Sequence, residues 1–198
     1  MTRALAMNGP VSCQAAICVA EEPARIEDFL RAVERRGFLM AKIALGHEAD
    51  AMDALQDTML RLVQGYAGRP AAEWRPLFYR ILRNRITDFR RRRKIEALLG
   101  MWRSAPGDDE TEDPIEQLPD PAGGDPERLV AGERRGQALV KALAALPARQ
   151  QQAFMLRCWE GLSTAETAQA MGCTEGSVKT HYFRAMHALR EELEEHWP

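Results

Sequence analysis

The segment Leu162–His181 constrains the fold of this chain most, because its sequence specifies two helices joined by a tight turn. Ser163 and Glu166 have the S-x-x-E spacing of a capping box, which predicts the start of a helix. Gly172 predicts the end of that helix, since glycine adopts the left-handed conformation of a C-cap without strain. Thr174 then predicts the N-cap of a second helix. This layout is typical of a DNA-binding helix-turn-helix, whose second helix enters the major groove.

The predicted second helix has an apolar face and a polar face. Residues at spacings of three and four form the apolar face, which should be buried: Val178, Tyr182, Ala185 and Leu189. The outward face carries Gly176, Lys179, Thr180, Phe183, Arg184 and His187. Lysine, arginine and threonine suit phosphates and base edges. The alternative is an ordinary amphipathic hairpin with a solvated polar face. The two caps and the outward Phe183 favour DNA binding, because an exposed aromatic ring gains nothing in a monomer.

Charge is sorted along the chain, although the net charge is only −2. Residues 73–94 hold nine Arg and Lys against two acids, whereas residues 106–127 hold nine Asp and Glu and no Arg or Lys. Such sorting implies different partners for different segments. A hydrophobic content of 45% is ample for packed cores, so the chain is not disordered throughout.

The cysteines and the apolar content predict a reduced, cytoplasmic protein with no membrane insertion, no cofactor and no metal site. The four cysteines have no zinc-ribbon spacing: Cys13, Cys18, Cys158 and Cys173. Residues 1–22 are expected to form a flexible extension, in which Met7 is an alternative start.

The chain is predicted to be all-α, with two small helical domains. Residues 96–126 are rich in proline, glycine and acids and poor in apolar residues, so they should form a linker. The linker separates a first domain at 23–95 from a helix-turn-helix domain at 127–198. Neither domain has strand-like alternation.

The first domain should contain three helices, Ile26–Leu45, Glu48–Gln64 and Glu73–Lys94. The first should turn Ile26, Phe29, Leu30 and Val33 inward. The second should bury Met52, Leu55, Met59 and Leu62. Its opposite face carries a carboxylate stripe of Asp50, Asp53 and Asp57. That stripe is a solvated face in the simplest interpretation.

The third helix should have an apolar side made of Trp74, Phe78, Ile81, Leu82, Ile86 and Phe89. Its outer side carries Arg80, Arg83, Asn84, Thr87 and Arg91. The five consecutive cations Arg90–Lys94 repel one another unless an anion is near. With Trp74 and Tyr79 close by, this helix suits a nucleic-acid backbone whose bases stack on aromatic rings.

Five ordered segments resemble motifs of the extracytoplasmic-function (ECF) sigma factors of bacterial RNA polymerase. Residues 50–60 resemble D-A-x-D-x-x-Q-D/E-T-F-L, and residues 78–91 resemble the helix L-Y-R-I-A-x-N-x-x-x-D-x-x-R. Residues 146–154 resemble L-P-x-x-x-R/Q-x-x-F, and residues 161–168 resemble G-L-S-x-x-E-I-A. Residues 176–180 match G-T-V-K-S. A compact chain of two such domains and a linker is similar to the ECF class.

The resemblance implies a function that is not enzymatic and has no catalytic residues. A first set matches the family's contact with core polymerase, on the clamp helices of β′ and on β: Asp50, Asp53, Gln56 and Asp57. A second set matches recognition and opening of the −10 promoter element: Trp74, Tyr79, Arg80, Arg83, Asn84, Thr87 and Arg91. A third set matches recognition of the −35 element: Ser177, Lys179, Thr180, His181, Phe183 and Arg184.

The resemblance also implies a pocket for an unstacked base between this third helix and the preceding loop, Gly65–Glu73. An anti-sigma factor is a further candidate partner. The sequence departs from the family pattern at Leu77, where tryptophan is common, and at Arg85, whose charge falls near the apolar side of its helix.

Two other functions remain open on the residues alone. A response-regulator-type activator could carry a similar recognition helix, but the N-terminal half lacks an α/β receiver pattern. A nuclease could use Asp50, Asp53 and Asp57 as metal ligands, but no histidine or second acidic cluster completes a site.

Overall fold

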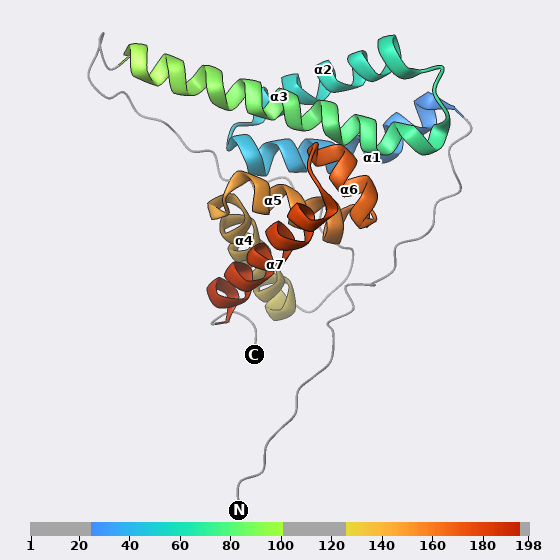
Figure 1. Cartoon of the computed structure of the whole chain (residues 1–198). Helices are drawn as coiled ribbons and strands as arrows, with labels where there is room; N and C mark the ends of the chain where they lie inside the picture. The colour runs from blue at the N-terminus through green and yellow to red at the C-terminus, as the bar shows by residue number, and fades with distance from the viewer. Residues whose placement is uncertain (1–24, 101–125, 195–198) are drawn as a thin grey trace, which may run out of the picture.

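The computed structural model describes residues 25–100 and 126–194 and divides them into two helical domains (Figure 1). The first domain consists of α1 (Ile26–Leu45), α2 (Glu48–Tyr66) and α3 (Ala71–Gly100). The second consists of α4 (Pro126–Ala145), α5 (Ala148–Phe154), a π-helical turn η1 (Met155–Trp159), α6 (Thr164–Met171) and α7 (Glu175–Leu193). The extension predicted at 1–22 and most of the predicted linker lie outside the described residues. The prediction of an all-α chain with two domains is confirmed.

Aromatic side chains fill the core of the first domain. The Phe29 ring lies 5.9 Å from that of Trp74 and 6.0 Å from that of Phe78, between centroids. Gly37 allows α1 to approach this cluster, because a Cβ at this position would lie 3.0 Å from Phe78 Cζ and 3.1 Å from Leu55 Cδ1. Three helices therefore share one core, with α1 contacting both α2 and α3.

Two sequence predictions for this domain were wrong in detail. The third helix, predicted to end at Lys94, extends to Gly100, so residues 96–100 of the predicted linker continue α3. On α2, Met52 is 41% exposed and is not part of the core. The buried positions Ala51, Ala54 and Thr58 take its place, because small side chains let α2 pack closely on its neighbours. The buried Thr58 hydroxyl is satisfied, since it donates to the Ala54 carbonyl at 2.6 Å.

The structure confirms the predicted helix-turn-helix and the residues predicted to cap its two helices. Ser163 Oγ accepts from the Glu166 amide at 3.2 Å, and the Ser163 amide donates to Glu166 Oε2 at 2.7 Å. Gly172 ends α6 with a φ of +58°, in the left-handed region. Thr174 Oγ1 accepts from the Ser177 amide at 3.2 Å and so caps α7.

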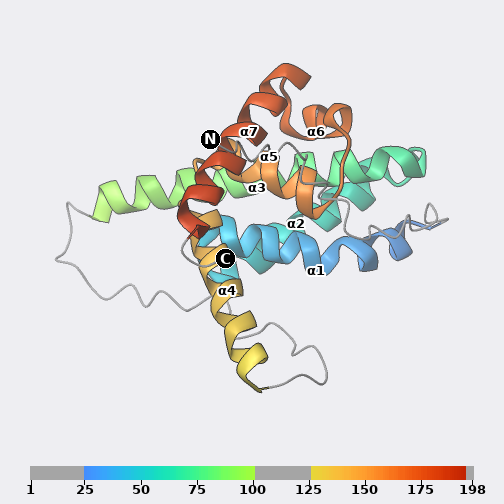
Figure 2. The same ribbon diagram turned by 90° about the horizontal axis from the view of Figure 1, so that it is seen from below.

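The two domains pack against each other, which the sequence did not predict. The helix α6 lies along α3, and α4 contacts α1, as the two views in Figures 1 and 2 agree. The linker joins domains that are already in contact. In residues 25–100 and 126–194, no helix is long and apolar enough to cross a membrane.

Candidate nucleic-acid interface

A cleft of about 1020 Å³ opens between the domains along the polar side of α3. The end of α2 and the helix α5 form its other walls. Its basic side chains come from both domains: Arg61, Arg80, Arg83, Arg85, Arg90 and Arg149. So many cations in one concave surface create a positive potential that attracts a polyanion such as a nucleic-acid backbone.

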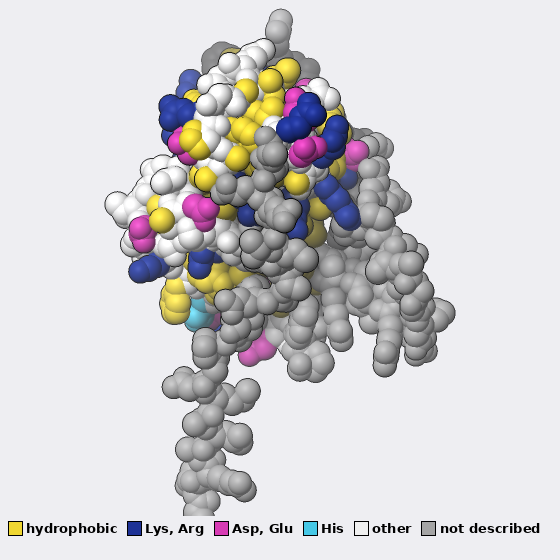
Figure 3. Space-filling model, turned by 90° about the vertical axis from the view of Figure 1, so that its right-hand side faces the viewer, with side chains coloured by type: hydrophobic (Ala, Val, Ile, Leu, Met, Phe, Trp, Pro, Cys, Tyr) yellow, Lys and Arg dark blue, Asp and Glu magenta, His cyan; other side chains and the backbone are white. Residues whose placement is uncertain are grey.

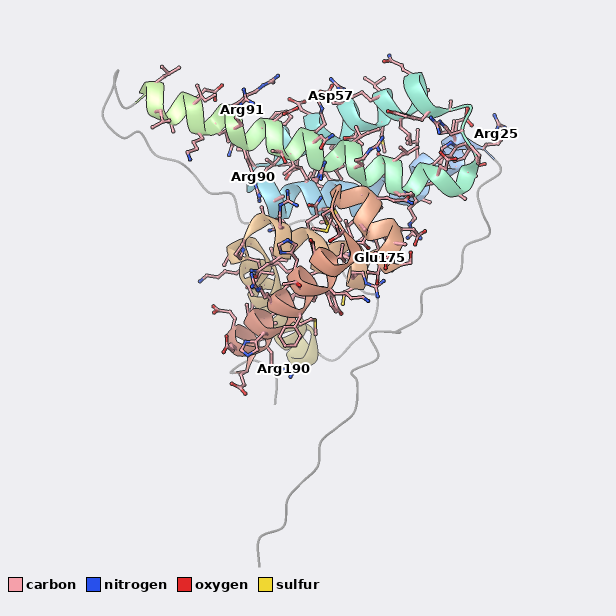
Figure 4. The ribbon with its side chains drawn as sticks, viewed as in Figure 1. Arg25, Asp57, Arg90, Arg91, Glu175 and Arg190 are labelled. Carbon is pink, nitrogen blue, oxygen red and sulfur yellow. The ribbon has the colours of Figure 1, made fainter. Side chains whose placement is uncertain are left out.

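The outer side of α3 remains open to solvent over most of the predicted −10 set. The exposed members are Arg80, Asn84, Thr87 and Arg91. Asn84 Oδ1 accepts from Arg83 Nη2 at 2.7 Å, and Thr87 Oγ1 donates to the Arg83 carbonyl at 2.9 Å. In Figure 4, Arg91 lies on the side of α3 away from the second domain, and Arg90 on the side facing it. These polar groups are therefore held in one row on a rigid helix.

A second surface, on α2, combines acids with exposed apolar side chains. We call it the α2 surface, and it consists of Met52, Asp53, Gln56, Asp57, Leu60 and Val63. Leu60 is 57% exposed and Val63 is 42% exposed. Figure 4 shows Asp57 on the edge of α2 away from the second domain, and Figure 3 shows hydrophobic side chains between charged ones on the upper part of the molecule. Exposed apolar area ringed by charge is typical of a protein-binding surface.

Two members of the carboxylate stripe pair with arginines of α3. Asp50 Oδ2 lies 2.7 Å from Arg93 Nε. Asp57 Oδ2 lies 3.7 Å from Arg85 Nη1, whose other terminal nitrogen, Nη2, lies 3.4 Å from Asp88. These ion pairs explain how Arg85 is tolerated near the apolar side of its helix.

The helix α7 presents the predicted −35 set on its outward face. Lys179, Thr180, Phe183 and Arg184 are exposed, and the Phe183 side chain is 69% exposed. The predicted inner face is confirmed, with Val178, Ala185 and Leu189 buried and Tyr182 half-buried and stacked on Phe154. Nothing in the described residues covers Phe183, so its exposure is consistent with a contact made outside the free protein.

His181 and Ser177 are less accessible than the rest of this set. Both side chains are half-buried, and His181 Nδ1 is buried. Burial lowers the pKa of His181, and the cations of Arg149 and Arg184 lower it further. The imidazole is therefore neutral near pH 7 and adds no charge to the recognition helix.

Both domains match models of known families. Residues 26–95 match Sigma-70 region 2, and residues 136–189 match Sigma-70 region 4. The RNA polymerase sigma-E factor of Streptomyces avermitilis is 31% identical over 176 residues, which are 87% of each chain. The ECF RNA polymerase sigma factor SigL of Mycobacterium tuberculosis is 31% identical over 155 residues, 76% of this chain and 78% of SigL.

The chain belongs to the ECF sigma factors. As such it directs promoter recognition by RNA polymerase, and the response-regulator alternative is not favoured. The fold is also similar to a solved structure of the sigma factor RpoE of Bartonella quintana, in complex with the anti-sigma factor NepR. That likeness has a TM-score of 0.57 at 24% identity and covers 85% of this chain and 98% of RpoE.

In this sigma factor the first domain is thus region 2 and the second is region 4. Arg83 is the residue of the predicted −10 set whose side chain is bonded to region 4. Its guanidinium donates to the Met171 carbonyl at the end of α6. Burial lowers the Arg83 pKa, and the nearby cation of Arg149 lowers it further. The Arg83 side chain is therefore half-buried in the cleft, with one amino group already bonded to region 4.

The two aromatic members of the −10 set are buried. Trp74 is 5% exposed in the core of region 2, where Nε1 donates to the Tyr66 carbonyl at 3.2 Å. Tyr79 is 1% exposed, and burial, followed by the negative charge of Glu160 in region 4, raises its pKa well above the usual value. Neither ring is accessible to a base here. Tyr66, which the sequence analysis missed, lines the cleft beside Gly65 and is half-buried.

Arg90 and Arg93 in the basic run of α3 have structural partners. Arg90 donates from Nε and Nη2 to the Ala44 carbonyl, at 3.0 and 2.6 Å, and from Nη2 to Gln151 Oε1 at 3.3 Å. It thereby satisfies a carbonyl at the C-terminal end of α1. With Arg93 paired to Asp50, part of the repulsion in the run is relieved inside the protein.

Proposed function

We propose that this sigma factor divides promoter recognition between α3 of region 2, which binds and opens the −10 element, and α7 of region 4, which reads the −35 element. The observation that carries the proposal is the exposed row of polar side chains on α3 along a basic cleft. The exposed outward face of α7 supports the second part. The α2 surface would bind core RNA polymerase, on its β and β′ subunits, because exposed acids and exposed apolar groups lie together there.

The cleft offers a place for an unstacked base. Gln64, Gly65 and Tyr66 line one side of it, and Arg80 and Asn84 line the other. Extruding a base costs a few kcal/mol, which capture by stacking and hydrogen bonds offsets. Tyr66 is our candidate for the stacking ring, since Trp74 is held in the core.

Arg80→Ala and Asn84→Ala should reduce promoter opening while leaving polymerase binding intact, because both side chains are exposed and contribute little to folding. Permanganate footprinting on a supercoiled promoter would measure the loss of reactive thymines near −10. Arg31→Ala is the matched control, since Arg31 is an exposed arginine on α1 that does not line the cleft. Unchanged thymine reactivity in both variants would contradict a role for α3 in opening.

Arg184→Ala should weaken −35 recognition, by roughly 1–3 kcal/mol if the guanidinium contacts a base edge. Binding to single-base variants of the −35 element at two salt concentrations distinguishes the two possible contacts. A base contact predicts relaxed preference at one position, whereas a phosphate contact predicts uniform loss and a shallower salt dependence. Arg190→Ala, at the far end of α7 in Figure 4, is the control. If Arg184→Ala and the control bind every −35 variant with the same affinity, the assignment of this face of α7 to −35 recognition is wrong.

The same proposal makes the protein a non-catalytic, cytoplasmic partner of RNA polymerase. An anti-sigma factor is a further candidate partner, supported by the likeness to RpoE, which was solved with NepR. A metal-dependent nuclease is disfavoured, because a metal at Asp50 and Asp57 would have to displace the arginines paired with them.

A further inference from the structure

Glu160 is a carboxylate of region 4 that is buried at the boundary with region 2. It follows the π-helical turn η1, and its amide donates to the Met155 carbonyl at 3.0 Å. The residue is only 1% exposed. Acidic side chains are almost never buried to this extent unless they are paired.

Among the described residues, the cations that pair with the Glu160 carboxylate come from region 2. On α3, Arg75 Nη2 donates to the Glu160 carbonyl at 2.8 Å and to Oε2 at 3.4 Å. On α1, Arg36 Nη1 lies 3.9 Å from the same carboxylate oxygen. Tyr79, on α3, is close enough that the Glu160 charge adds to burial in raising the tyrosine pKa, but its buried hydroxyl has no hydrogen-bond partner among the described residues. One side chain of region 4 thus holds two helices of region 2.

The stability of this cluster depends on the domains staying together. A buried carboxylate that loses its cationic partners carries a desolvation penalty of several kcal/mol. If the domains separate, however, Glu160 returns to water and the penalty disappears. Removing the arginines should therefore destabilise the closed arrangement rather than either domain.

The closed arrangement also keeps region 2 from engaging DNA fully. Arg83, of the proposed −10 set, donates to the carbonyl of Met171 at the C-terminal end of α6. The C-terminal end of a helix carries partial negative charge, which favours a nearby cation. The Met171 carbonyl therefore takes the place that a DNA phosphate or base would have as the acceptor for Arg83. The −10 and −35 elements are 25 base pairs apart by their numbering, or about 85 Å in B-form DNA. Domains whose helices touch cannot read both elements.

We propose that Glu160 is an interdomain latch: clamped between Arg36 and Arg75, it holds region 4 over part of the −10 face, and the free sigma factor becomes competent for promoter binding only when this latch opens. The inference rests on the proposed function of Arg83, but the latch itself is defined by contacts that do not depend on it.

Two variants of opposite charge test the latch in the full-length protein. Glu160→Lys raises the net charge by two, and the double variant Arg36→Ala and Arg75→Ala lowers it by two. Small-angle scattering should give a larger radius of gyration for both, with unchanged helical circular dichroism. Without polymerase, both should bind DNA carrying the two promoter elements about tenfold more tightly, which is 1.4 kcal/mol. Simple charge effects would instead move their affinities in opposite directions.

Glu192→Lys is the matched control, because it makes the same charge change at an exposed position on α7. It should leave the radius of gyration as in the parent. The latch is overturned if both test variants retain the parent radius, or if both lose helical signal, which would assign Glu160 to folding rather than to domain closure. If the radius increases while DNA affinity does not, the latch stands and the assigned role of Arg83 in −10 binding is wrong.

Discussion

Replacing Phe78 with alanine should destabilise region 2 by about 3–5 kcal/mol, the usual cost of removing a buried phenylalanine. Phe78 is 0% exposed, and its ring contacts those of Phe29 and Tyr79 edge-on at 6.0 and 5.1 Å. The cavity would open where α1 and α3 meet, and Gly37 on α1 has no side chain to fill it. Urea denaturation followed by circular dichroism would measure the loss.

Phe183→Ala is the matched control for this result. The same chemical change at a ring that is 69% exposed should alter the unfolding free energy by no more than about 0.5 kcal/mol. It should instead reduce binding to the −35 element. Equal losses of stability in the two variants would contradict the placement of Phe183 outside the core.

The second large effect is expected at the α2 surface. The double variant Asp53→Arg and Asp57→Arg should weaken binding to core polymerase by at least about 1–3 kcal/mol, the scale of close charge pairs between proteins. Both residues are exposed, so region 2 should still fold. Competition between variant and parent for core polymerase would measure the change.

Glu34→Arg controls for the added positive charge, since Glu34 is an exposed acid on α1, outside the α2 surface. Asp53→Arg should also be measured alone, because Asp57 pairs with Arg85 and its replacement removes that ion pair. If the double variant binds core polymerase as tightly as the control, the α2 surface is not the docking site.

The latch places these surfaces in a sequence of events. The α2 surface and the outward face of α7 are open in the closed arrangement, whereas Arg83 is occupied. If polymerase binds the α2 surface as proposed, that binding can therefore precede separation of the domains. A partner that favours the open arrangement would shift the population by its differential affinity for it.

The helix-turn-helix was predictable because its determinants are local. Each cap joins residues three or four positions apart, as Ser163 joins Glu166, so the sequence alone specifies where these helices begin and end. The outward position of Phe183 followed from helical periodicity in the same way. The predicted core of α2 was less accurate, because periodicity favoured the bulky Met52 over the alanines that actually face α1 and α3.

What the sequence determined about this protein is therefore its helices, their polar and apolar faces, its division into two domains and its family. Only the tertiary structure decided which polar residues are free to act. Arg90 contacts a carbonyl 46 residues away, and Arg83 one 88 residues away. Arg75 reaches Glu160 across 85 residues. Such contacts depend on which faces of distant helices meet, and local sequence patterns do not encode that choice.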